Sequence, residues 1–105
     1  MPERAGYILI TFRVFPEDEQ FVSRCEELGV ASCGDTAAEA LDNIVDATEL
    51  YLEAVGDEER ERVFDQGGVH IMYGTPPPAD SSRAVRASPG EFVLPYFMPL
   101  RVAVA

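Results

Sequence analysis

A capped amphipathic helix, predicted for residues 36–55, is the feature that most constrains the fold of this chain. The helix begins with the capping box Thr36-Ala-Ala-Glu39, in which the Thr36 hydroxyl accepts the Glu39 N–H and the Glu39 carboxylate reaches back to the Thr36 N–H. Asp35 adds negative charge at the positive end of the helix dipole. Gly56 is the residue expected to end the helix. The rest of the chain must supply a surface that covers its apolar face.

The two faces of this predicted helix differ in chemistry. Apolar side chains recur at helical spacing at Ala37, Leu41, Ile44, Val45, Thr48, Tyr51, Leu52 and Val55. The opposite face carries the carboxylates of Glu39, Asp42, Asp46, Glu49 and Glu53. Like charges at this spacing repel by roughly 0.2–0.5 kcal/mol per pair. We therefore expect this strip to bind a cationic partner, and the alternative is an ordinary solvated helix face.

The charge of the chain is concentrated in its middle third. The formal net charge is −11, and residues 35–65 supply −9 of it. Binding to phosphate groups needs a cationic surface, so direct binding to nucleic acid is not expected. A basic partner would be attracted to such a segment, although the acidity could equally serve solubility alone.

A β-hairpin is predicted ahead of the helix. Residues 7–15 alternate so that Ile8, Ile10, Phe12 and Val14 share one face. A turn at residues 16–19, centred on Glu17 and Asp18, leads to a return strand at 20–25 and pairs Phe12 with Ser23. A short third strand at 30–33 then leads into the helix.

Beyond Gly56 the pattern predicts three further segments. Asp57 can cap a short second helix that ends at Gly67-Gly68 and is anchored by Val63 and Phe64. Residues 69–73 follow as a fourth strand, expected to return parallel to the first strand by a right-handed crossover. Residues 75–90 contain Pro76-Pro77-Pro78 and are expected to form a linker.

The C-terminal segment, residues 91–105, is predicted to be a long edge strand. Pro95 and Pro99 have the same parity, so both missing N–H donors fall on one edge of the strand. The strand could pair with its own sheet or with a second subunit, and we expect a homodimer or a higher homo-oligomer that uses this tail. The residues proposed for that contact share one apolar face: Phe92, Leu94, Tyr96, Met98 and Leu100.

Together these elements predict an α+β fold of β-β-β-α-β type, with a small sheet covered by one long helix, a short second helix and a C-terminal edge strand. Residues 1–74 form the α/β domain of this organisation. No apolar run approaches the ~20 residues of a membrane span. The N-terminus lacks the apolar core and cleavage site of a signal peptide, so a cytoplasmic protein is expected.

No constellation of catalytic or metal-binding residues is evident in the sequence. His70 is the one histidine and fits a half-exposed strand position, and the serines lack a recognisable base. Two cysteines and one histidine cannot form an all-Cys/His tetrahedral zinc site. Cys25 and Cys33 could form a cross-strand disulfide, but two buried thiols are the commoner outcome in a cytoplasmic protein. We expect no enzyme activity, no metal and no cofactor.

The motifs around the helix carry a resemblance to a known family. Gly34-Asp-Thr36, Glu39-Ala-Leu41, Asn43 and Glu49-Leu-Tyr-Leu-Glu53, following a β-hairpin, resemble the HicB-like antitoxin family over about residues 7–56. The resemblance implies a degenerate, partial RNase H-like fold without nuclease activity. It also implies a role in toxin–antitoxin modules, in which the HicB-like protein binds a small basic HicA-like mRNA-degrading toxin and shields its catalytic histidine.

Two features depart from that family. Members usually carry a Leu-Pro-Gly-Cys-like turn, where this chain has Glu27-Leu-Gly-Val30. Many members end in a DNA-binding domain, whereas residues 75–105 show no such helices, so a stand-alone member is expected. The resulting hypotheses are an antitoxin-type protein that neutralises a basic RNase, or a homo-oligomeric protein of the same fold without a toxin. An enzyme is the third and least favoured.

Overall fold

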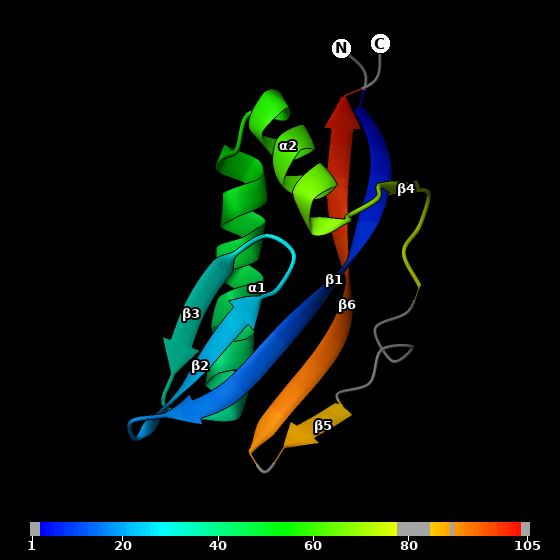
Figure 1. Ribbon diagram of the computed structural model, residues 1–105. Helices are drawn as coiled ribbons and strands as arrows, with labels where there is room; N and C mark the ends of the chain where they lie inside the picture. The colour runs from blue at the N-terminus through cyan, green and yellow to red at the C-terminus, as the bar shows by residue number, and fades with distance from the viewer. Residues whose placement is uncertain (1–2, 78–84, 89, 104–105) are drawn as a thin grey trace.

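The computed structural model describes residues 3–77, 85–88 and 90–103, and these form an α+β fold with two helices on one side of a twisted sheet (Figure 1). This confirms the predicted fold class. In chain order the elements are β1 (Glu3–Glu17), β2 (Gln20–Cys25), β3 (Val30–Gly34), α1 (Ala37–Ala54), α2 (Asp57–Gly67), β4 (Met72–Tyr73), β5 (Val85–Ser88) and β6 (Glu91–Ala103). No helix in the described part of the chain is long and apolar enough to cross a membrane.

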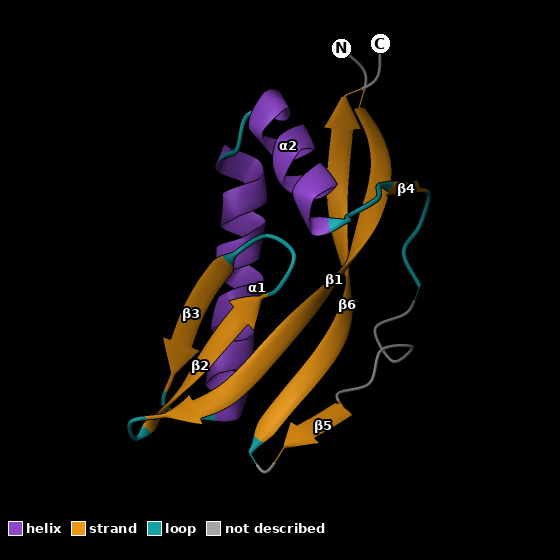
Figure 2. Ribbon diagram, in the orientation of Figure 1, coloured by secondary structure: helices purple, strands orange, loops and turns teal. Residues whose placement is uncertain are grey.

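The sheet has the strand order β3-β2-β1-β6-β5, and β4 pairs separately with β1 (Figure 2). Every pairing is antiparallel, including that of β4 with β1. The predicted parallel return of the fourth strand is therefore wrong. The physical reason is that α2 carries the chain part of the way back along the sheet after α1, so β4 approaches residues 6–7 of β1 from below and runs antiparallel to it (Figure 1).

The β1–β2 hairpin closes one residue later than the sequence pattern predicted. Asp18 and Glu19 form the two-residue loop and both have positive φ, 47° and 65°. Such a loop matches the twist of the two strands. Phe12 consequently faces Cys25 and not Ser23. Each residue of β1 thus pairs with a β2 residue two positions later than predicted. Because side chains alternate between faces with a period of two, the predicted apolar residues stay on the inner face.

The long C-terminal strand β6 is an integral strand of this sheet. It pairs with β1 along its length, from Val14↔Phe92 to Glu3↔Ala103. On its other side β5 pairs only with residues 91–93, so the rest of that edge has no strand partner among the described residues. β5 itself lies within the predicted linker, of which residues 78–84 and 89 fall outside the described residues.

The register also shows where the two prolines of β6 point. The Thr11 N–H donates to Glu27 Oε1 at 2.7 Å, and the Thr11 carbonyl accepts from the Glu26 N–H at 3.0 Å. Both Thr11 groups therefore point away from β6, which makes Thr11↔Pro95 a non-hydrogen-bonded pair. The Pro95 nitrogen then faces the outer edge, as does that of Pro99, which confirms the predicted blunting of that edge.

The core lies between the sheet and the helices. Ile8, Ile10 and Phe12 from β1 have no exposed surface, and neither do Ile44 from α1 and Met98 from β6. The strand residues among them all have even numbers. The even-numbered residues of β1 and β6 share the inner face of the sheet, as the alternation of the sequence predicted. The sequence pattern missed Ala40, which is also fully buried.

The capping box at the start of α1 forms with one change of partner. The Thr36 hydroxyl accepts from the Glu39 N–H at 3.1 Å, as predicted. The Glu39 carboxylate accepts from the Asp35 N–H at 3.3 Å and not from that of Thr36. At the other end, α1 finishes at Ala54, and Gly56 is the residue that precedes α2.

The segment between α2 and β4 is packed rather than extended. Gly68 has φ 70°, and the Val69 N–H donates to the Phe64 carbonyl at 2.8 Å, which forms a Schellman-type helix end. Val69 is thereby buried in the core and cannot begin a strand. The predicted strand at 69–73 is reduced to Met72–Tyr73, and His70 is exposed outside it.

The two cysteines are free and lie on opposite faces of the sheet. Cys25 pairs with Val30 and is fully buried, whereas Cys33 pairs with Val22 and is exposed. The predicted pair of buried thiols is therefore wrong for Cys33. Burial raises the pKa of the Cys25 thiol to about 11.

We expect iodoacetamide to modify Cys33 in the native protein and to modify Cys25 only after unfolding, because the thiolate is the reactive form and burial suppresses it. Peptide mass spectrometry before and after addition of urea measures both sites. Equal native labelling of the two thiols would contradict the buried position of Cys25.

Candidate functional site

The carboxylate strip of α1 is exposed, and four of its five members have no ion-pair partner among the described residues. All five predicted residues, Glu39, Asp42, Asp46, Glu49 and Glu53, are exposed. Glu39 is engaged in the helix cap. Within the described residues the ion pairs join Arg13 to Glu26 and Glu91, Arg60 to Asp57, and Arg62 to Glu59. The four remaining carboxylates of the strip are thus free to bind an external cation.

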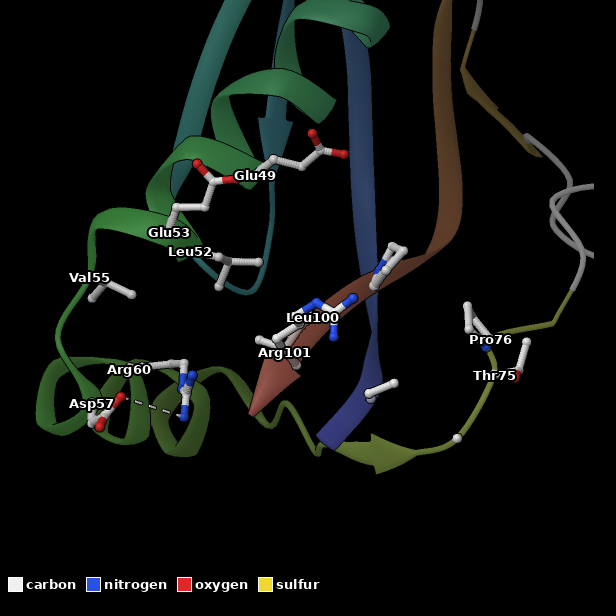
Figure 3. Close-up of a pocket in the computed structure, with 14 residues that line it drawn as sticks. Glu49, Leu52, Glu53, Val55, Asp57, Arg60, Thr75, Pro76, Leu100 and Arg101 are labelled. Atoms are coloured by element: carbon white, nitrogen blue, oxygen red, sulfur yellow. Dashed lines mark ion pairs between the residues drawn. The ribbon is translucent and has the colours of Figure 1, made fainter. Parts of the chain in front are cut away.

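Two separate cavities lie between α1 and β6, one near each end of α1, and we call the region that contains them the α1–β6 groove. α1 packs mainly over β3 and β2, reaches β1, and makes few contacts with β6. One cavity of about 730 Å³ opens where the end of α1 and the start of α2 approach residues 99–101 of β6 (Figure 3). A smaller cavity of about 150 Å³ lies between Leu41 near the start of α1 and Leu94 of β6.

The floor of the α1–β6 groove is the set of residues proposed from the sequence for an oligomer contact. Of Phe92, Leu94, Tyr96, Met98 and Leu100, only Met98 is fully buried, and the other four keep part of their surface exposed. All five face inward, toward the helices of their own chain, because they pair with the inner-face residues of β1. A partner could reach the four exposed members only from the groove.

The helix wall of the groove changes from apolar to acidic. Ala38, Leu41 and Leu52 line the two cavities from α1. On the helical wheel these residues fall in one stripe, and the carboxylate strip begins beside it with Glu49. Glu49 and Glu53 both line the larger cavity, and Asp57, Arg60 and Arg101 line it as well, so its charged lining is mixed (Figure 3). The sequence placed the strip and the tail in separate sites, and the fold brings them together.

Glu49 also lies near the floor of the groove. Burial, and secondarily the negative charge of Glu49, raises the pKa of the Tyr96 hydroxyl. Tyr96 packs its ring against Phe12, with 5.2 Å between ring centroids, so its position on the floor is fixed by the core. The middle of the groove therefore combines an aromatic surface with a carboxylate.

The larger cavity is lined by a poorly paired arginine. Arg60 Nη2 lies 3.8 Å from Asp57 Oδ1, and only 15% of the Arg60 side chain is exposed. Its Nε is buried and has no hydrogen-bond partner among the described atoms. Sequence reasoning missed this residue, because nothing in the charged run of α2 distinguishes Arg60 from Arg62.

The carboxylates of the described residues do not converge on a common point. No group of three or more His, Cys, Asp or Glu side chains that could hold a metal ion occurs within residues 3–77, 85–88 and 90–103. A comparison with protein-family models, with curated protein sequences and with solved structures finds no match to this chain.

Proposed function

We propose that this protein is a HicB-like, antitoxin-type binding protein that neutralises a small basic mRNA-degrading toxin by direct contact. The observation that carries the proposal is the strip of exposed carboxylates along α1, of which Asp42, Asp46, Glu49 and Glu53 have no ion-pair partner within the part of the chain that the structure describes. A chain of net charge −11 attracts a cationic ribonuclease over distances comparable with the Debye length, ~8 Å at physiological salt. Once bound, the strip occupies the cationic surface that the toxin needs for RNA.

The test is relief of growth arrest by co-expression with the small basic protein encoded in the neighbouring reading frame. The variant Asp42→Asn/Asp46→Asn/Glu49→Gln removes three charges from the strip, and we expect it to lose at least about tenfold in affinity and to fail to restore growth. The matched control is Glu58→Gln/Glu61→Gln/Asp65→Asn, which removes three exposed charges from α2. We expect the control to restore growth.

Two results would overturn the proposal. One is equal loss of rescue by both triple variants, which would show that only net charge matters. The other is a complex whose affinity does not fall as salt concentration rises, because the proposed attraction joins surface charges. A neighbouring frame that encodes no small basic protein would favour the alternative, a homo-oligomeric protein of this fold without a toxin.

A further inference from the structure

We infer that two copies of this chain form a dimer through the outer face of the sheet, which is the face opposite the helices. The inference goes beyond the proposed function and does not depend on it, because the contact needs no second kind of protein. The apolar side chains that would form the centre of the contact come from β1, β4 and β6, and we call them the outer apolar row: Tyr7, Leu9, Met72, Val93, Pro95 and Phe97.

The strand register determines which side chains reach this face. The even-numbered residues of β1 are buried beneath the helices, so Tyr7 and Leu9 point to the opposite side of the sheet. Residues directly opposite each other in antiparallel strands share a face, which places Phe97 beside Leu9 and Met72 beside Tyr7. Both helices lie on the inner side of the sheet and leave the outer apolar row uncovered (Figures 1 and 2).

The outer apolar row differs from an ordinary solvated sheet face. When one face of an antiparallel sheet is in contact with water, its side chains are usually polar. Here Leu9 is 44% exposed, and the Tyr7 ring packs edge-on against Phe97 with 5.9 Å between the ring centroids. A single exposed leucine is unremarkable in a protein surface, but adjacent apolar side chains from several strands on one face are typical of an interaction surface.

The charges of the outer face nearly balance. By register the face carries Arg13, Arg24, Arg101, Glu17 and Glu91, and it also includes Glu26 and Glu27, whose carboxylates bind the Arg13 guanidinium and the Thr11 hydroxyl. Three arginines and four glutamates give a net charge of −1, whereas the whole chain has −11 and residues 35–65 alone supply −9. The excess negative charge therefore lies on the side of the helices.

This charge distribution favours a second copy as the occupant. Nucleic acid and anionic lipid are repelled by the net charge of the chain, and a cationic partner gains little from a nearly neutral face. A second copy brings an identical apolar and balanced surface, which a two-fold axis can place against the first. Stacked sheets lie about 10 Å apart, and the helices are on the outer sides of such a pair. The two carboxylate strips are then separated by more than the Debye length of ~8 Å.

Light scattering on the full chain over a dilution series tests the inference, and we expect a mass twice that of one chain. Leu9→Glu places a carboxylate in the apolar contact from both copies and should raise the dissociation constant at least about 100-fold. Leu50→Glu is the matched control, because Leu50 is 65% exposed on α1, away from the outer face. It should leave the dimer intact. Both leucines are exposed, so both variants should keep the far-UV circular dichroism spectrum of the wild type.

The salt dependence of the mass is a second readout. An apolar contact between two acidic chains should persist or tighten as salt concentration rises, because screening weakens their mutual repulsion. The proposed complex with a basic toxin should weaken under the same conditions. Leu9→Glu should still restore growth in the co-expression test, since the strip on α1 lies on the other side of the sheet.

Four outcomes would overturn the inference: a wild-type monomer throughout the dilution series, an unchanged dimer in Leu9→Glu, dissociation by Leu50→Glu, or a dimer that dissociates as salt rises. Dissociation by Leu94→Gln with no effect of Leu9→Glu would also overturn it and would move the contact to the inner face. These failures are distinct from failure of the proposed function, because the mass is measured on the protein alone and rescue is measured with the toxin.

Discussion

A chain that ends at Gly90 is expected to lose cooperative folding altogether. Such a chain lacks β6, which pairs with β1 from Glu3 to Val14. It also lacks Met98, which is fully buried against Ile8 and Ile10 in the core. Each fully buried side chain of this size contributes about 1.5–3 kcal/mol, and total stabilities of domains are only about 5–15 kcal/mol. Loss of Met98, of the partly buried side chains of Phe92, Leu94, Tyr96 and Leu100, and of the pairing with β1 together is therefore comparable with the whole stability of the domain.

Urea titration followed by far-UV circular dichroism measures this effect. The matched control is a chain that ends at Ala103, which keeps all of β6 and should unfold with an unchanged midpoint. A cooperative transition in the shorter chain, with a midpoint close to that of the full chain, would show that β6 is an appended segment and not part of the core sheet.

Gly34→Ala is expected to destabilise the fold by about 2–3 kcal/mol, which is the cost of overpacking against atoms that cannot move aside. A Cβ at position 34 would lie 2.6 Å from the backbone nitrogen of Ala40 and 2.9 Å from the carbonyl carbon of Glu39. These are main-chain atoms in the first turn of α1, so relief requires the helix to lift from β3. The strip and the groove wall would move with it.

The free energy of unfolding of the variant, from urea titration, tests this prediction. Gly56→Ala is the control, because a Cβ there meets nothing within 4 Å and φ is −73°. Its cost should stay within about 1 kcal/mol, as for other changes at a helix N-cap. Equal effects of the two substitutions would mean that the close approach of β3 to α1 is not what requires glycine at position 34.

Local chemistry was sufficient to predict most of the individual elements. The alternation of Ile8, Ile10 and Phe12 identified the inner face of β1, and the Thr36–Glu39 capping box located the start of α1. Both signals arise from neighbours within one turn or one strand. The parity of Pro95 and Pro99 predicted a blunted edge for the same reason.

Features that depend on distant contacts were predicted less well. The hairpin register depends on the positive φ of Asp18 and Glu19, which the pattern of Pro16 to Glu19 did not reveal. The direction of β4 depends on the path of α2 over the core, and burial of Val69 shortened the strand. The direction and the length of β4 follow from packing between segments far apart in the chain, whereas the hairpin register follows from the backbone conformation of its two-residue loop.

The sequence by itself determined that this protein is α+β and that one helix bears a strip of carboxylates, because repeat spacing and charge are properties of short segments. Only the tertiary structure decided that α1 lies over β2 and β3 and makes few contacts with β6, whose inner-face residues other than Met98 are only partly buried. That placement follows from the strand order, which puts β6 on the far side of β1 from β2 and beyond the width of a single helix. The two cavities between α1 and β6 exist for that reason.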